Sequence, residues 1–201
     1  MPIMIGLVSQ KGGAGKTTSA IALACALAQR HTVHLIDADP QSSVSRWASI
    51  ATLPARLTVS SVSRVSELKR GQPTADFVII DTKGELSADA LPFIDLALIP
   101  CAPSLFDLWA AEPTVTLVKA QQAVRPGLRA AVFATKVKEG TVLGADVLDE
   151  IAGFELPVLS VHLSDKIGYP TSIATGSNPA SYSTTRLESL RFAKAIEELL
   201  K

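Results

Sequence analysis

The run Gln10-Lys11-Gly12-Gly13-Ala14-Gly15-Lys16-Thr17-Thr18 decides the fold of this 201-residue chain. It follows an apolar stretch over residues 3–8 and precedes an Ala/Leu-rich stretch over residues 17–29, a pattern typical of a strand followed by a helix. Glycines in such a loop let successive backbone N–H groups close on phosphate oxygens, and the helix N-terminus adds partial positive charge. The run therefore predicts a cradle for a phosphorylated ligand.

The side chains of this loop complete the predicted site. Lys16 is placed to reach the β- and γ-phosphates of a nucleotide, and the Thr17 hydroxyl is placed to ligate Mg²⁺. The run departs from the usual G-x-x-x-x-G-K-[ST] pattern, because Gln10 stands where that pattern has glycine and Lys11 adds a second lysine. The predicted nucleotide-binding residues are Lys11, Gly12, Gly13, Ala14, Gly15, Lys16, Thr17 and Thr18.

Composition describes an ordinary globular chain. Its hydrophobic content of 47% and charged content of 19% favour one domain over residues 1–201. We expect no membrane span, since no apolar run reaches about eighteen residues, and no signal peptide. Cys25 and Cys101 are far apart, so we expect two buried free thiols in a cytoplasmic protein. The net charge of zero gives no support for nucleic-acid binding by itself.

Continuous apolar runs alternate with helical patterns along the chain. Strands are expected over residues 3–9, 32–37, 57–60, 77–81, 96–100, 130–135 and 157–162. Helices are expected over residues 17–29, 42–49, 62–70, 88–93, 108–124, 145–151 and 186–200. Runs that are apolar throughout indicate strands buried on both faces. The sequence therefore predicts an α/β fold, with a mostly parallel central sheet, helices on both faces, and ligands at the carboxyl ends of the strands.

The expected last helix has one apolar side and one charged side. Its charges are mixed in sign, whereas helices that lie on membrane surfaces are usually basic, so we expect it to pack on the core. Thr185 and Glu188 match the S/T-x-x-E pattern of a capping box at its start.

Carboxylates follow two of the expected strands. Asp37 and Asp39 stand in the D-A-D-P sequence just past the second strand, and Asp81 follows the apolar run over residues 77–80. Because parallel strands place their carboxyl ends at one edge of the sheet, these groups should lie beside the glycine-rich loop. A carboxylate there can orient an attacking water or hold Mg²⁺. Together with the loop, these acids predict an ATPase.

The loop, the D-x-D-P sequence and the strand that ends at Asp81 together resemble the ParA/MinD family of deviant-Walker P-loop ATPases, most of all its small ParF-like partition members. Residues 98–107 are similar to the proline-containing segment after the next strand of that family, and residues 110–122 to the following helix. The resemblance implies binding of ATP and Mg²⁺ and a homodimer that sandwiches two nucleotides. It implies catalytic roles for Lys11, Lys16 and Asp39, with Lys11 reaching the partner's phosphates, and metal binding by Thr17, Asp37 and Asp81. It also implies that Thr135 and Lys136 approach the base.

The resemblance further implies a weak ATPase that binds DNA nonspecifically, is nucleoid-associated in the ATP state, and segregates or positions plasmid or chromosomal DNA. A ParB-like centromere-binding adaptor would stimulate its hydrolysis. Because the loop begins near residue 10, we expect no N-terminal operator-binding domain. Candidate DNA contacts are Lys136, Lys138, Lys166, Arg186 and Arg191.

Two alternatives stay open at this stage. One is a MinD-like, membrane-associated positioning ATPase. The other is a nucleotide-binding scaffold without turnover, because Lys83 stands where the family usually has proline.

Overall fold

The apolar runs of the sequence form a parallel sheet. The computed structural model describes residues 1–63, 67–68, 74–84, 87–138 and 151–201. The sheet has the strand order β3-β2-β4-β1-β5-β6-β7, and each described pair of neighbouring strands is parallel. The strands are β1 (Ile3–Leu7), β2 (Val33–Ala38), β3 (Leu57–Ser61), β4 (Phe77–Thr82), β5 (Leu96–Cys101), β6 (Arg129–Val137) and β7 (Leu163–Ser164).

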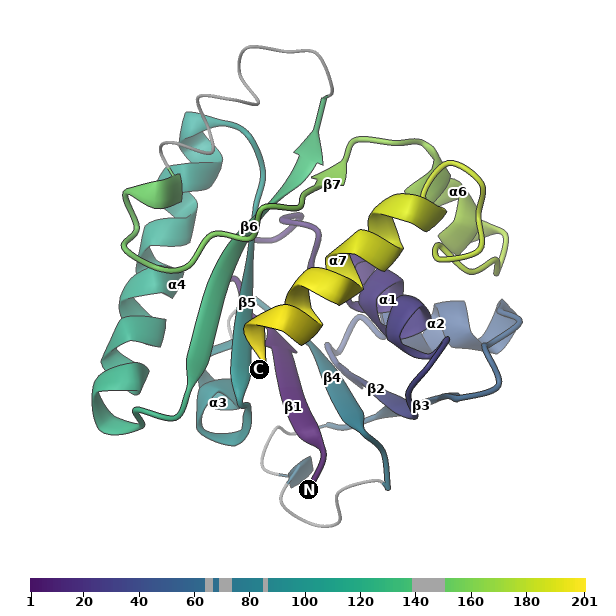
Figure 1. Cartoon of the computed structure of the whole chain (residues 1–201), viewed down its shortest axis with the longest axis horizontal. Coiled ribbons are helices and arrows are strands. Elements are labelled where there is room, and N and C mark those ends of the chain that lie inside the picture. Colours follow the sequence, from purple (N-terminus) through teal and green to yellow (C-terminus); the bar gives the residue numbers. More distant parts are fainter. Residues whose placement is uncertain (64–66, 69–73, 85–86, 139–150) are drawn as a thin grey trace.

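Helices cover both faces of this sheet (Figure 1). One face carries α1 (Lys16–Leu27), α2 (Ser43–Ile50), α6 (Gly168–Ala174) and α7 (Arg186–Leu199). The other carries α3 (Ser87–Ala90), the 3₁₀ turn Leu91–Phe93 and α4 (Leu105–Val124). The two faces bury separate hydrophobic cores. The predicted α/β fold is thereby confirmed.

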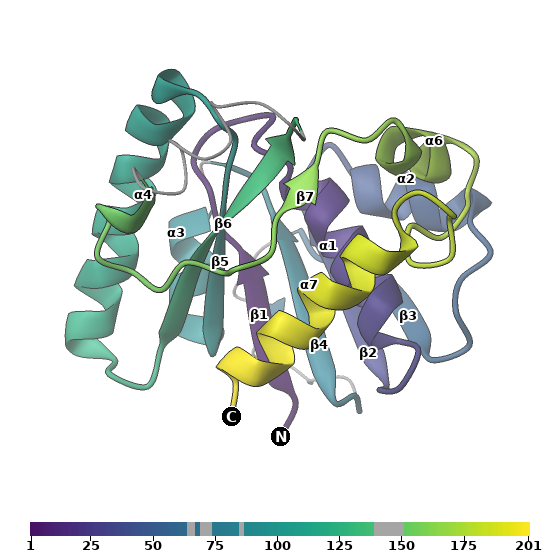
Figure 2. The ribbon, with the colours of Figure 1, turned by 45° about the horizontal axis from the view of Figure 1, so that its top comes forward.

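The glycine-rich loop leads into a helix that is buried almost throughout. From Ala20 to Leu27 helix α1 is apolar on every side, and α7 packs against it on the side away from the sheet (Figure 2). Phe192 and Ile196 of α7 are fully buried, and the Phe192 ring lies 4.8 Å from the ring of Phe133. The expected packing of the last helix on the core is therefore confirmed. Cys25 and Cys101 are buried free thiols, as expected.

The strand expected over residues 157–162 is wrong. Val158 forms an isolated bridge to Val132, and regular pairing with β6 resumes only where Leu163 meets Thr135. The chain therefore advances five residues from Val158 to Leu163 while β6 advances three from Val132 to Thr135, and the extra residues interrupt the hydrogen-bond ladder. Lys136, with φ of 54°, adds a second irregularity in β6.

The structure differs from the sequence prediction in two of its helices. Helix α6 was not predicted, because its glycine, proline and β-branched residues are poor helix formers. The capping box at Thr185 and Glu188 is also wrong: the Thr185 hydroxyl donates to the carbonyl of Pro179, and Glu188 turns toward other partners. The helices expected over residues 62–70 and 145–151 fall mostly outside the described residues.

Glu188 ties α7 to the segment around β7. Its carboxylate accepts hydrogen bonds from the Ser164 backbone and hydroxyl at 3.0 and 2.6 Å and from the Tyr169 hydroxyl at 2.7 Å. Lys166 lies at 3.4 Å. Burial alone would raise the pKa of Glu188, but these donors hold it below its usual value. The carboxylate therefore stabilises the fold when ionised.

Replacement of Glu188 with glutamine is expected to lower the free energy of unfolding by about 1–3 kcal/mol at pH 7, because buried donors lose a charged acceptor. A depressed pKa means that this contribution is present above the usual value of 4.5 and is lost as the pH falls below it. Urea unfolding of parent and variant at pH 7 and pH 4 measures the effect. An equal difference at both pH values would contradict it.

Candidate functional site

The carboxyl ends of β1, β2 and β4 meet at the glycine-rich loop. The strand register places Asp81 beside both Leu7 and Asp37. A cavity of about 530 Å³ opens here, a size suited to a small ligand. It is lined by Gln10, Gly12, Gly13, Gly15, Lys16, Thr17, Thr18, Asp39, Gln41, Lys83, Gly84 and Lys136.

The loop curves around the ammonium group of Lys16. Gly13 and Gly15 have φ of 75° and 94°, a region that strongly favours glycine. The Lys16 Nζ donates to the carbonyls of Ser9 and Lys11, each at 2.9 Å. Burial lowers the pKa of Lys16, and the nearby Asp81 and Asp39 oppose that shift. Lys16 is therefore a partly desolvated cation at the N-terminus of α1, an arrangement that suits phosphate binding.

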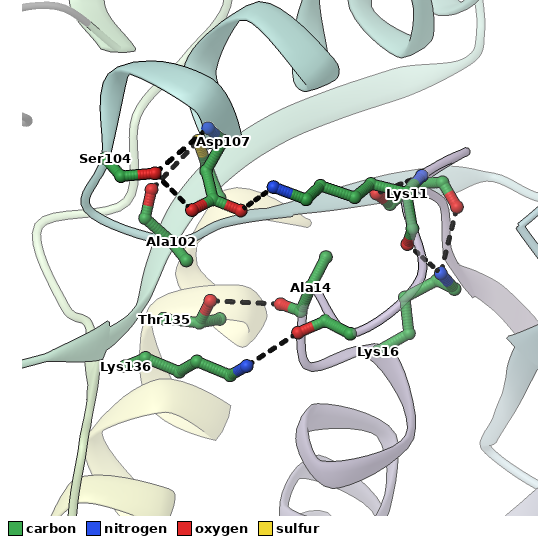
Figure 3. Close-up of polar contacts among 11 residues, drawn as sticks. Lys11, Ala14, Lys16, Ala102, Ser104, Asp107, Thr135 and Lys136 are labelled. Atoms are coloured by element: carbon green, nitrogen blue, oxygen red, sulfur yellow. Dashed lines mark hydrogen bonds and ion pairs between the residues drawn. The ribbon is translucent and has the colours of Figure 1, made fainter.

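Lys11 points away from this cavity. Its Nζ lies 2.5 Å from Oδ1 of Asp107, in the first turn of α4 (Figure 3). Ser104 caps that helix by accepting from the Asp107 backbone N–H, and its hydroxyl donates back to the Asp107 carboxylate. Partial burial alone would raise the pKa of Asp107, but Lys11 and Ser104 hold it below its usual range. The two lysines of the loop thus have different environments, one inside the cradle and one outside it.

Asp81 is an unpaired carboxylate in a buried position. It is 1% exposed, and neither of its oxygens has a hydrogen-bond partner among the described residues. Burial raises the pKa of Asp81 to about 7, although the nearby Thr17 hydroxyl and Lys16 lower it. An orphaned carboxylate beside a hydroxyl is a donor set that suits Mg²⁺, which prefers oxygen ligands. Asp81 and Thr17 therefore fit the metal site that the sequence predicted.

Asp37 is equally buried but well partnered. Its Oδ2 accepts from the Ser45 backbone and hydroxyl, both at 2.8 Å, and its Oδ1 accepts from the Asp39 N–H at 3.2 Å. These contacts tie the end of β2 to the first turn of α2. Asp39 lines the cavity, and its Oδ1 accepts from the Gln41 N–H at 2.8 Å. Of the two acids in the D-x-D-P sequence, Asp39 is the one in contact with the space where a ligand would lie.

The end of β6 approaches the loop from the other side. The Thr135 hydroxyl donates to the carbonyl of Ala14 at 3.0 Å, and the Lys136 Nζ donates to the carbonyl of Gly13 at 2.7 Å (Figure 3). Lys136 therefore belongs to the loop cavity. Two other basic residues proposed for DNA contact, Lys166 and Arg191, line a separate cavity of about 230 Å³ beside α7.

Sequence reasoning missed Gly84. A Cβ at this position would lie 2.5 Å from the carbonyl oxygen of Gln10, so glycine alone permits this approach of the segment after β4 to the loop. The adjacent Lys83 also lines the cavity. The signal that could have found Gly84 is its position three residues after Asp81, at a strand end that faces the loop.

Comparisons with known proteins identify the family and fold to which this chain is similar. The CobQ/CobB/MinD/ParA nucleotide binding domain family matches residues 5–180. The chain is 28% identical over 181 residues to Maintenance of carboxysome distribution protein A of Halothiobacillus neapolitanus, over 86% of this chain and 84% of that protein. It is 32% identical over 146 residues to Protein ParA of Rhizobium radiobacter, over 68% and 65%. The structure of apo McdA from Cyanothece shares the fold, with a TM-score of 0.82 at 18% identity over 100% of both chains.

Proposed function

This chain belongs to the CobQ/CobB/MinD/ParA family of nucleotide-binding domains, and from that premise we propose that it is a positioning ATPase controlled by dimerisation. ATP with Mg²⁺ would bind each protomer, two protomers would enclose the two nucleotides, and hydrolysis would separate them. The position of Lys11 carries this proposal. It is the loop's second lysine, yet its ammonium group is held outside its own cradle by Asp107, from where it can serve a partner's phosphates.

The residues around the cavity have different roles in this proposal. Loop backbone N–H groups and Lys16 bind the phosphates, and Asp39 orients the attacking water or accepts its proton. Thr17 and Asp81 would hold Mg²⁺, with Asp37 keeping the segment after β2 in place through Ser45. When bound, Mg²⁺ neutralises negative charge that develops on the phosphoryl oxygens. Lys11 would add positive charge only after assembly, so monomers would turn over slowly.

We propose that the ATP-bound dimer binds DNA without sequence preference and uses the DNA as a track for positioning a cargo. An adaptor protein bound to the cargo would stimulate ATP hydrolysis. The names of the two relatives, a carboxysome distribution protein and a ParA protein, support a positioning role. Lys166 and Arg191 supply basic groups beside one cavity. Plasmid or chromosomal DNA is one cargo of this kind and a protein-bounded compartment is another.

The MinD-like alternative has less support. None of the helices in the described part of the chain has the length and hydrophobicity that a membrane span requires. The apolar side of α7, which could have lain on a membrane, instead packs against α1 with Phe192 and Ile196 fully buried. We therefore propose DNA rather than a lipid surface as the track.

Binding to duplex DNA tests this function. We expect Asp39→Asn, which should bind ATP without hydrolysing it, to bind a random-sequence duplex with Mg-ATP and to release it with Mg-ADP. Fluorescence anisotropy should show equal affinity for an unrelated duplex and a steep loss of affinity as salt rises. Lys166→Gln with Arg191→Gln should weaken binding, whereas Lys194→Gln, on the same helix but paired with Glu198, is the matched control. Equal binding with ADP, or none at low salt, would refute the DNA track.

A further inference from the structure

Lys83 is a cavity residue to which the proposed function gives no role. It stands directly after β4 and is half-buried at the wall of the cavity. The charged side chains among the described residues that line the cavity are Lys16, Lys83, Lys136 and Asp39. Lysines are therefore in excess over acids, and such an excess suits a ligand with several negative charges, such as a nucleoside triphosphate.

The backbone is anchored on both sides of Lys83. The buried Thr82 hydroxyl donates to the carbonyl of Leu7 in β1 at 2.7 Å. On the other side, Gly84 lies so close to the loop that a Cβ there would come within 2.5 Å of the Gln10 carbonyl oxygen. A residue anchored in this way loses less conformational freedom when its side chain binds a ligand. Lys83 is therefore preorganised at the wall of the cavity.

The strand order indicates toward which end of a nucleotide Lys83 lies. Strand β4 is next to β1, which leads into the glycine-rich loop, and β2 is the next strand on that same side (Figure 1). Asp39 follows β2 and Lys83 follows β4, so both approach the loop from this side, whereas Lys136 comes from β6 on the other side of β1. In the proposed function Asp39 orients the water that attacks the terminal phosphate. Lys83 therefore lies on the side of that phosphate, and Lys136 on the opposite side.

We infer that Lys83 binds the terminal phosphate of ATP and thereby makes the site select ATP over ADP. This inference rests on the proposed function, which places ATP in the cavity. An ammonium group on a flexible stem can reach a phosphate oxygen, and such a charge-assisted hydrogen bond is stronger than a neutral one. ADP lacks the terminal phosphate, so the same lysine gains no such contact with ADP. A single protomer then distinguishes the two nucleotides before any partner binds.

The nucleotide preference of Lys83→Gln tests the inference. Competition with a fluorescent nucleotide, at protein concentrations at which light scattering shows monomers, gives dissociation constants for Mg-ADP and for a non-hydrolysable ATP analogue with Mg²⁺. We expect Lys83→Gln to weaken binding of the analogue about tenfold or more, because it loses a charge-assisted hydrogen bond. The constant for Mg-ADP should stay at the parent's value, which also shows that the variant is folded. Lys83→Arg should keep the parent's preference, since it keeps the charge.

Lys136→Gln is the matched control. Lys136 lines the same cavity, and its Nζ donates to the Gly13 carbonyl at 2.7 Å, but it lies on the side away from Asp39. Its replacement should change both dissociation constants by the same factor. If Lys136→Gln loses ATP preference as strongly as Lys83→Gln, only the total charge of the cavity matters and the inference is wrong. Lys83→Gln with the parent's preference would overturn the inference alone, whereas a parent that binds neither nucleotide would overturn the proposed function as well.

Discussion

Replacement of Lys11 with alanine is expected to abolish ATP turnover while leaving ATP binding intact. Lys11 is outside the cavity in the monomer, so the cradle formed by Lys16 and the loop backbone does not depend on its side chain. A cation delivered to the transferred phosphoryl group by a partner typically raises kcat by a factor of about 10³–10⁵. The variant should therefore lose at least about 10³-fold in kcat under the conditions that stimulate the parent.

Two further variants show that this effect is specific to Lys11. Lys16→Ala should lose ATP binding itself, because Lys16 is the cation that the loop encloses. Lys194→Ala, on the exposed side of α7, should retain both binding and turnover. Binding is measured with a fluorescent ATP analogue, and turnover by phosphate release in the presence of DNA and cargo adaptor. Normal turnover by Lys11→Ala would refute the assembly-dependent mechanism.

Replacement of Asp81 with asparagine is expected to abolish Mg²⁺-dependent turnover and, in the absence of nucleotide, to change how stability depends on pH. Both effects follow from the carboxylate having no partner among the described residues at 1% exposure. When ionised it is a cost to the folded protein, because burial is not compensated. The same unpaired oxygens are what a divalent cation would use.

The sign of the pH effect follows from the raised pKa. The pKa of Asp81 is about 7 in the folded protein and 3.8 in the unfolded one, so the folded state binds a proton more tightly. The destabilisation is therefore absent below pH 3.8, grows as the pH rises, and is complete above pH 7. The free energy of unfolding of Asp81→Asn minus that of the parent should therefore increase by about 2–3 kcal/mol between pH 5 and pH 8.

Urea unfolding of both proteins at the two pH values measures this difference. Glu188 titrates in the opposite direction, but it is present in both proteins and its effect cancels from the comparison. If the free energies of unfolding of parent and variant change with pH in parallel, the pKa of Asp81 is not raised by burial in the folded protein. Addition of Mg²⁺ with ATP should stabilise the parent much more than the variant.

Sequence reasoning reached the parts of the fold that local pattern determines. Strand β5 is apolar throughout and β4 is apolar from Phe77 to Ile80, and this pattern alone indicates burial on both faces. The meeting of Asp37 and Asp81 followed from the rule that parallel strands end at one edge. The family resemblance, carried by the glycine-rich loop, is confirmed by the family match.

The rest depends on contacts between distant residues. Asp107 holds Lys11 from 96 residues away, and Glu188 meets Ser164 across 24 residues. Neither pairing leaves a local pattern in the sequence. The S/T-x-x-E pattern at Thr185 was misleading because Glu188 binds Ser164 and Tyr169 and forms no capping box. The false strand over residues 157–162 has a similar cause, since its apolar pattern does not show the surplus of residues opposite β6.

We propose that Lys11 acts on the nucleotide of the partner protomer, and mixing two inactive variants provides the test. Lys11→Ala and Asp39→Ala should each be inactive alone. In a mixed dimer, the Lys11→Ala protomer keeps its own Asp39 and receives Lys11 from its partner, so one of the two sites is complete. Equal mixing with random pairing should restore about a quarter of the parent's turnover, because half of the dimers are mixed and each has one working site. If the mixture stays as inactive as its components while mixed dimers form, Lys11 acts within its own protomer and the claim is wrong.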